Sequence, residues 1–154
     1  MDEKILADVI VRYENASFTV NRRINAMIKD GMPEGLTLEQ YGTLKYLQGH
    51  DRSTSSELAS IFCVGKSSIT AIITRLFDKQ LITRQPDDKD RRVTYLSLTD
   101  KGGAAVDAMH DKIKEMLGTV IQHFDEHEAI AFVETFEKLA QVLVQPDEGD
   151  IEKK

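Results

Sequence analysis

The sequence has a single cysteine among its 154 residues and lacks any long apolar run. One cysteine excludes an internal disulfide and fits a reducing compartment. No run of about 18 or more apolar residues occurs, so no membrane-spanning helix is expected. The polar start at residues 1–4 does not resemble a secretory signal. These absences predict a cytoplasmic protein without a membrane partner.

Catalytic motifs are also missing. The chain contains no phosphate-binding glycine loop, no His-Glu-x-x-His run and no nucleophile elbow. Asp87, Asp88 and Asp90 cluster as catalytic carboxylates do, but three basic residues lie beside them on a predicted ribbon tip. A ribbon tip is a poor place for a pocket, so we predict that the protein is not an enzyme.

A metal site is not expected either. His123 and His127 have the spacing of two ligands on one helical face. A helix break predicted at Asp125 lies between them, so the two imidazoles need not share a face. The alternative is a pair of surface histidines near a helix junction. The sequence therefore predicts no metal ion and no other cofactor.

Residues 53–99 predict a short helix, a tight turn, a second helix and a two-stranded ribbon. Thr54 and Glu57 have the spacing of a capping box, which begins the first helix. In the second helix, residues 66–79, apolar side chains recur at helical spacing. Its opposite face carries small, polar or basic side chains and no acidic one: Lys66, Ser67, Thr70, Ala71 and Thr74. Such a face suits base recognition in a major groove, and the alternative is a merely solvated face.

The ribbon at about 82–98 ends in a basic tip. Pro86 begins a turn signal, and residues 89–92 are Lys-Asp-Arg-Arg. The returning strand alternates so that Leu96 and Leu98 would point inward. An arginine-tipped hairpin fits a minor groove, where the electrostatic potential is most negative; the alternative is an ordinary charged hairpin. The combination of two helices and a basic wing favours the first interpretation.

The distribution of charge supports this interpretation locally. The whole chain carries a net charge of −6, which by itself argues against a nucleic-acid partner. Residues 51–101, however, hold nine Lys/Arg against seven Asp/Glu, and residues 66–92 hold seven against four. Positive charge is thus concentrated where the second helix and the ribbon would face phosphate groups.

Long amphipathic segments flank this lobe. Residues 5–28 carry one apolar helical stripe over about 24 residues, roughly twice the length of an average helix. Glycine and proline within residues 31–35 end it. Thr37 and Gln40 form a second capping box, and Gly49 closes the helix that follows.

Another long helix begins at Thr99 or Asp100, after the ribbon, and breaks near Asp125. Asp125 and Glu128 have capping-box spacing, so a last helix should occupy residues 126–144. Residues 145–154 are polar and are predicted to form a flexible tail. The fold class is therefore mainly α with a small β-hairpin wing.

The long helices carry more apolar surface than one small lobe can cover. Packing of the helices at about 4–30 and 100–144 against a second copy would bury it, which predicts a two-fold homodimer. Each subunit would form one domain over residues 1–144, with a DNA-binding lobe at about 37–99 that contains the helix-turn-helix at about 53–76. A two-fold protein requires a pseudo-palindromic operator, with recognition helices ~34 Å apart.

Several short motifs in the lobe form a specific pattern. They are Leu58-Ala59, residues 64–70 (Val-Gly-Lys-Ser-Ser-Ile-Thr), residues 81–84 (Leu-Ile-Thr-Arg), Asp90-Arg91-Arg92 and residues 98–102 (Leu-Thr-Asp-Lys-Gly). Over roughly residues 5–143 the chain resembles the winged helix-turn-helix regulators of the MarR family. The resemblance implies a helical dimerisation base that carries two winged-helix lobes. It also implies a transcriptional repressor that binds double-stranded DNA and is released by a small aromatic or phenolic ligand.

Candidate DNA contacts come first from the two helices. The free face and the edges of the second helix contribute Lys66, Ser67, Ser68, Thr70 and Arg75. Arg75 could instead pair with Asp78 in the same helix. Thr54 begins a helix whose N-terminus could meet a phosphate, or it could act as a cap alone.

The ribbon contributes the remaining candidates. Arg84, at its base, is a phosphate contact or a partner for one of the aspartates at residues 87–88. The family resemblance implies that Asp90 braces Arg92, which then enters the minor groove. Arg91 is the neighbour that reaches backbone phosphate.

Three positions depart from the family pattern. Cys63 occupies a turn position where glycine is usual, and Gly65 replaces a small hydroxyl residue that would cap the recognition helix. Gln80 replaces a usual glycine, at a cost of roughly 1–2 kcal/mol if it must be left-handed. The apolar neighbours of Cys63 favour a buried, inert thiol, whereas the nearby helix N-terminus and Lys66 would favour a reactive one.

A second class of function stays open. A non-catalytic helical dimer that binds another protein, without specific DNA binding, would share the same long helices. The basic wing argues against this alternative, and a gel shift with genomic fragments separates the two functions.

Two of the candidate contacts should affect binding in different ways. Arg92→Ala is expected to weaken operator binding by about 1–3 kcal/mol, because a groove contact is lost. Lys66→Ala is expected to lower the slope of log affinity against log salt by about one, since one phosphate contact is lost. Salt titrations of both variants against the same duplex measure these effects, and unchanged binding in both overturns the assignment.

Overall fold

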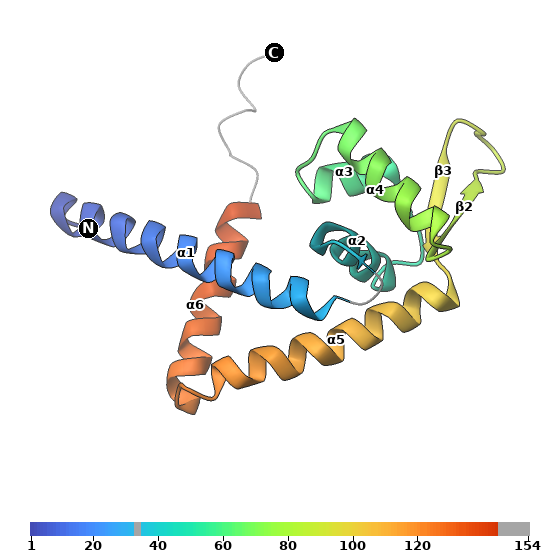
Figure 1. Cartoon of the computed structure of the whole chain (residues 1–154). Coiled ribbons are helices and arrows are strands. Elements are labelled where there is room, and N and C mark those ends of the chain that lie inside the picture. The colour runs from blue at the N-terminus through green and yellow to red at the C-terminus, as the bar shows by residue number, and fades with distance from the viewer. Residues whose placement is uncertain (33–34, 145–154) are drawn as a thin grey trace, which may run out of the picture. The chain divides into compact units, whose positions relative to one another are not determined.

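The computed structural model describes residues 1–32 and 35–144, and this part of the chain is mainly helical with one small sheet (Figure 1). The predicted fold class is confirmed. In chain order the elements are α1 (Glu3–Gly31), α2 (Leu38–Gln48), β1 (Ser53–Thr54), α3 (Ser55–Ile61), α4 (Lys66–Asp78), β2 (Ile82–Pro86), β3 (Thr94–Leu98), α5 (Asp100–Ile121) and α6 (Glu126–Val144). The chain divides into two compact units, Met1–Lys114 and Glu115–Lys154. The tail predicted for residues 145–154 lies outside the described residues.

All three predicted capping boxes are present, because each depends only on two residues three positions apart. In each box the first side chain accepts a hydrogen bond from the backbone N–H of the second residue. The second side chain accepts one from the backbone N–H of the first. The pairs are Thr37–Gln40, Thr54–Glu57 and Asp125–Glu128, at the starts of α2, α3 and α6.

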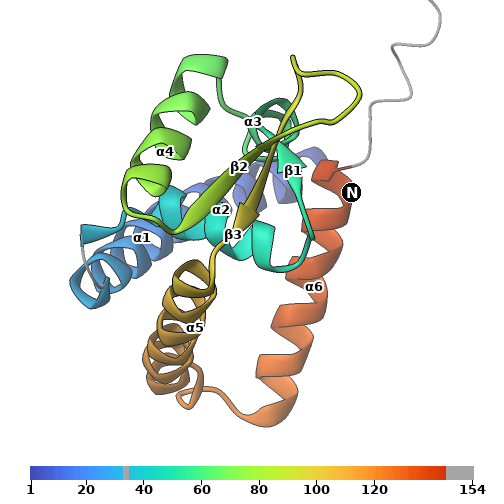
Figure 2. The same ribbon diagram turned by 90° about the vertical axis from the view of Figure 1, so that its right-hand side faces the viewer.

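The ribbon predicted as two strands is a three-stranded antiparallel sheet in the order β1-β3-β2 (Figure 2). β2 and β3 pair over five residues each. The strand that sequence reasoning missed is β1, which pairs with β3 as Ser53↔Leu96 and Thr54↔Tyr95. Two residues are too few to show a period of two, and Thr54 also caps α3. The segment therefore resembled a helix start alone.

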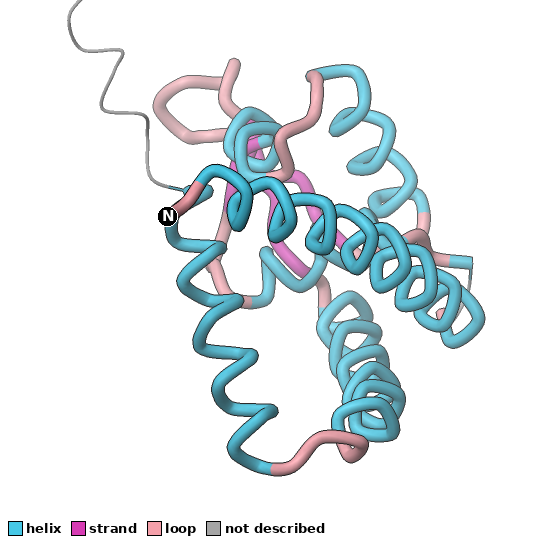
Figure 3. Tube along the Cα trace, turned by 90° about the vertical axis from the view of Figure 1, so that its left-hand side faces the viewer, coloured by secondary structure: helices cyan, strands magenta, loops and turns pink. Residues whose placement is uncertain are grey.

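The apolar core of the first unit lies between α2, α3, α4, the sheet and the first half of α5. Its buried side chains include Leu44, Leu58, Ile69, Leu76, Ile82, Leu96, Val106 and Met109. Leu96 points inward as predicted, whereas Leu98 is only half-buried at the edge of the core. Figure 3 shows the extended segments gathered in one place among these helices.

Within residues 1–32 and 35–144, two residues other than glycine have left-handed backbone conformations. Cys63 has a φ of 51° and Gln80 a φ of 61°, at a cost of roughly 1–2 kcal/mol per residue. Gln80 therefore carries the strain expected from the missing glycine. The predicted burial of Cys63 is wrong, since its thiol is exposed. The turn directs its neighbours Phe62 and Val64 toward the core instead.

The start of α5 closes on the end of α4. Thr99 donates its backbone N–H to the carbonyl oxygen of Leu81 at 3.1 Å and its hydroxyl to that of Gln80 at 2.7 Å. The Nζ of Lys101 donates to the carbonyl oxygen of Lys79 at 3.0 Å. These bonds fix the end of α4, the helix that carries half of the predicted DNA contacts, to the first turn of α5.

The long terminal helices keep their apolar residues exposed when each is taken by itself. No residue of α1 or α6 is buried. Phe18 in α1 is 68% exposed and Phe132 in α6 is 66% exposed. No single described helix has the length and the apolar composition of a membrane span; α3 and α4 meet that test only as a pair, across a bend of 115°.

Gly102→Ala is expected to destabilise the protein by about 1–3 kcal/mol, because the new Cβ would overlap the carbonyl oxygen of Leu81. Gly103→Ala is the matched control in the same helix. Nothing lies within 4 Å of its Cβ position, so this substitution should stabilise α5 by roughly 0.5–1 kcal/mol. Urea denaturation measures both changes, and two variants of equal stability would contradict the close approach at Gly102.

Candidate nucleic-acid interface

The helix α4 separates a buried side from an exposed side as the spacing predicts. Ile69, Ile73 and Leu76 are buried in the core. The predicted contacts on this helix are all exposed: Lys66, Ser67, Ser68, Thr70 and Arg75. Arg75 makes no ion pair with Asp78 in the described part of the chain, so that alternative is wrong.

Neither the cap nor the first turn of α4 supplies a group that offsets the positive end of this helix. Gly65 is the N-cap and makes no side-chain hydrogen bond, and the first turn contains no acidic residue. The weaker cap predicted from Gly65 is thus confirmed. The unpaired N–H groups and the helix dipole favour an anion at this end. Thr70 donates its hydroxyl to the carbonyl oxygen of Lys66 at 2.7 Å, which leaves its oxygen as an acceptor.

The N-terminus of α3 is different, because a carboxylate already lies there. The backbone N–H of Thr54 donates to Oε2 of Glu57 at 2.7 Å, and Oγ1 of Thr54 accepts from the N–H of Glu57 at 3.2 Å. The capping role of Thr54 is therefore confirmed. A phosphate at this point would meet the negative charge of Glu57, so its phosphate role stays a prediction with weaker physical support than that of α4.

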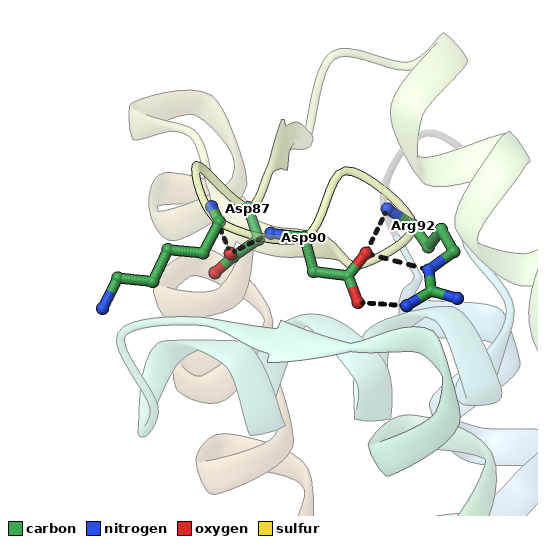
Figure 4. A network of polar contacts seen from close by, with 4 residues as sticks. Asp87, Asp90 and Arg92 are labelled. Atoms are coloured by element: carbon green, nitrogen blue, oxygen red, sulfur yellow. Dashed lines mark hydrogen bonds and ion pairs between the residues drawn. The ribbon is translucent and has the colours of Figure 1, made fainter.

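The tip of the wing is organised by two aspartates (Figure 4). Oδ1 of Asp87 accepts the backbone N–H groups of Lys89 at 2.8 Å and Asp90 at 2.9 Å. Asp90 then holds Arg92 by two parallel bonds, from Nε to Oδ1 and from Nη2 to Oδ2, both at 3.0 Å. The side chain of Arg92 nevertheless remains 90% exposed. The geometry matches the brace that the family resemblance implies.

These contacts also shift the acidity of the groups at the tip. The guanidinium and the backbone N–H of Arg92 lower the pKa of Asp90, and Asp90 in turn raises the pKa of Arg92. The backbone N–H groups of Asp90 and Lys89, with a smaller contribution from the charge of Arg52, lower the pKa of Asp87. Both aspartates are therefore ionised at neutral pH, and the pair between Asp90 and Arg92 is fully charged.

Arg84 lies on the inner side of the ribbon and faces α4. Its guanidinium carbon is 4.5 Å from the centre of the Phe77 ring, and its Nη2 is 3.4 Å from Oγ1 of Thr74. The predicted pairing of Arg84 with an aspartate at residues 87–88 is wrong. In the sheet register Arg84 is opposite the buried Leu96, and the alternation of the strand directs it toward the helix.

Sequence reasoning missed one pair of residues beside the wing. The guanidinium carbon of Arg52 lies 4.0 Å from the centre of the Tyr95 ring. Arg52 immediately precedes β1, and the hydroxyl of Ser97 holds this segment by donating to the carbonyl oxygen of Asp51 at 3.0 Å. Only recognition of β1 could have placed Arg52 beside Tyr95, because the two residues are far apart in the sequence.

A helix-turn-helix, an exposed face on its second helix without acidic residues, and an arginine at the tip of a braced ribbon together define a winged-helix DNA-binding protein. The model of the MarR family matches residues 36–94, from the residues before α2 to the first residue of β3. The chain belongs to the MarR family of DNA-binding transcriptional regulators. Proteins of this family are not enzymes, in agreement with the prediction from sequence.

Comparison with individual proteins extends the similarity beyond the lobe. The HTH-type transcriptional repressor MdtR of Bacillus subtilis (strain 168) is 29% identical over 127 residues, which is 82% of each chain. The crystal structure of the YusO protein from Bacillus subtilis is 30% identical with a TM-score of 0.66, and covers 92% of this chain and 99% of its own. A mutant MarR from E. coli, complexed with operator DNA, shares the fold with a TM-score of 0.73 at 21% identity, over 90% of this chain and 97% of that one.

Arg92→Ala is expected to raise the pKa of Asp90 toward its ordinary value, because the largest cause of the lowered pKa is lost. In the wild-type protein the brace is complete above the ordinary Asp pKa and is lost only as pH falls through the lowered, folded-state pKa. Arg91→Ala is the matched control, since Arg91 makes no contribution to this shift. An NMR titration of the side-chain carboxyl carbon measures the pKa, and identical values in the two variants would argue against the brace.

Proposed function

We propose that the protein is a transcriptional repressor that binds a pseudo-palindromic operator as a homodimer in the cytoplasm and is released by a small aromatic or phenolic ligand. The observation that carries this proposal is the braced Arg92 at the tip of a ribbon beside the exposed face of α4. The similarity to MdtR, a named repressor, supports repression.

The helix α4 would enter the major groove with its exposed side. Lys66 at the start of the helix contacts phosphate or base acceptors, and Ser67, Ser68 and Thr70 are short enough for close approach to base edges. The uncompensated N-terminus of α4 adds attraction for the DNA backbone. Arg75, exposed toward the other end, is a further donor.

The tip of the wing would enter the minor groove through Arg92. An arginine that is already held by two bonds loses less side-chain freedom on binding than one that moves freely. Asp90 thus acts on the orientation of Arg92 and itself touches no base. Arg91, exposed next to it, reaches the backbone phosphates that line the groove.

A second copy of the chain is the partner that the long helices favour. Side chains along α1 and α6, each helix taken by itself, are large, apolar and exposed: Ile5, Val9, Tyr13 and Phe18 in α1, and Ile130, Val133, Phe136 and Leu143 in α6. Water-exposed apolar surface costs about 25 cal/mol per Å² relative to burial. A two-fold interface over these helices removes that cost and pairs the two DNA-binding lobes.

The hydroxyl of Tyr41 supports a site for a small ligand. Tyr41 is 5% exposed, and its hydroxyl has no hydrogen-bond partner among the described residues. Burial raises the pKa of this phenol, which is therefore neutral. An unpaired buried hydroxyl costs roughly 1–3 kcal/mol. An aromatic acid or phenol that bonds to Tyr41 would remove this cost, and it would release DNA if it binds better to a conformation with a different lobe spacing.

Phe136→Glu is expected to convert the dimer to a monomer and to weaken binding to an inverted-repeat duplex by more than about 100-fold, because a charge would be buried at the interface. Phe136 is 59% exposed in the single chain, so the substitution leaves the monomer core intact. Gln141→Glu adds the same charge about 140° around the helix and should change neither property. Light scattering at micromolar concentration and gel shifts measure the two effects.

The duplex for this experiment is recovered from genomic fragments by selection with the wild-type protein. A wild-type protein that is monomeric at micromolar concentration, or a selection that enriches no inverted sequence, would refute the proposed function. A Phe136→Glu protein that remains dimeric would place the interface elsewhere and refute the role given to α6.

A further inference from the structure

The wing is held by an arginine on each of its two faces. In the sheet register Tyr95 is paired with Gln85 and Leu96 with Arg84, so Tyr95 and Arg84 lie on opposite faces. Arg84 contacts Phe77 of α4 on the inner face. Arg52 contacts Tyr95 on the outer face. The two arginines therefore link the ribbon to different parts of the helix-turn-helix.

The contact of Arg52 is well placed to control the ribbon. Arg52 comes two residues before Thr54, which caps α3 and pairs with Tyr95 in β3. Its guanidinium carbon lies 4.0 Å from the centre of the Tyr95 ring. Its charge also attracts Asp87, the residue that organises the tip. One side chain thus connects the segment before α3 with the middle of β3.

β1 pairs with β3 over only two residues, and a two-stranded hairpin by itself has marginal stability in water, so further contacts help to hold the ribbon. The link between Arg84 and α4 restrains it on one side only. Arg52 supplies the outer face of β3 with a cationic contact from the segment just before β1 and α3. An exposed cation–π contact shifts the equilibrium between the held and the displaced positions of the ribbon by roughly two- to five-fold.

We propose that Arg52 is a positioning residue that holds the wing at a fixed angle to the helix-turn-helix. Arg92 then reaches the minor groove when α4 occupies the major groove. This inference rests on the proposed DNA-binding mode. Arg52 acts through the ring of Tyr95, whose centre lies 4.0 Å from its guanidinium carbon, and not through phosphate.

The test measures the affinity of four variants for the selected operator duplex and compares each with the wild type. The variants are Arg52→Ala, Arg52→Lys, Tyr95→Phe and Tyr95→Leu. Arg52→Ala should weaken binding roughly two- to five-fold without changing the slope of log affinity against log salt. Tyr95→Leu should weaken binding by a similar factor, although it removes no charge, and the double variant should add nothing further. Tyr95→Phe, which keeps the ring, should bind as the wild type does. The affinity of Arg52→Lys should lie between those of the wild type and Arg52→Ala, because an ammonium stacks less well on a ring than a guanidinium.

Two controls separate positioning from direct contact. In an Arg92→Ala background Arg52→Ala should cause no further loss, since the angle of the wing matters only while Arg92 is present. Lys66→Ala reports what a phosphate contact does, with a slope lower by about one. NMR shifts of the Arg52 side-chain protons, measured without DNA, should show the ring-current effect of Tyr95 and lose it in Tyr95→Leu.

The outcomes are distinct. A slope that falls by about one in Arg52→Ala, with a loss that persists in the Arg92→Ala background, identifies a phosphate contact and overturns the proposal. Unchanged affinity in both Arg52→Ala and Tyr95→Leu also overturns it. A wild-type protein without operator binding refutes the proposed function itself, whereas failure of the Arg52 variants alone leaves that function standing.

Discussion

The DNA-binding lobe depends on the carbonyl groups of residues 79–81, which directly follow α4. The start of α5 supplies hydrogen-bond donors to all three of them. Thr99 bonds to Gln80 and Leu81, and Lys101 bonds to Lys79. β2 begins at the next residue and β3 ends just before Thr99. The recognition helix, the wing and α5 therefore share one anchor, and the left-handed strain at Gln80 is tolerated because these bonds hold the backbone there.

Local patterns in the sequence were enough to predict most of the fold. Each capping box depends on two residues three positions apart, and the tip of the wing depends on aspartates that bond to backbone groups two or three residues later. Such contacts join residues two or three positions apart, so they do not depend on how distant parts of the chain pack. The stripe of Ile69, Ile73 and Leu76 is equally local, because the period of the helix alone places these side chains on one face.

Two of the errors, at β1 and at Arg84, share a different cause, since each depended on strand pairing between separate segments. β1 is defined only by its pairing with β3, so its two residues gave no signal. The register of the sheet decides that Arg84 faces Phe77 and not the nearby aspartates. The apolar neighbours of Cys63 suggest that its side chain is buried. The left-handed backbone at this residue instead leaves the side chain exposed. A sequence can thus indicate which residues lie on an exposed face more easily than which residues pair across the sheet.

The exposed thiol in the turn before α4 has a practical consequence. Because Cys63 is the single cysteine of the chain and is exposed, one paramagnetic or fluorescent label can be attached at a unique position in the chain. The attachment point lies three residues before α4 begins and is fixed to it by the same turn. In a two-fold assembly, the distance between two such labels would follow the separation of the recognition helices directly, as a molecular ruler that needs no change to the sequence.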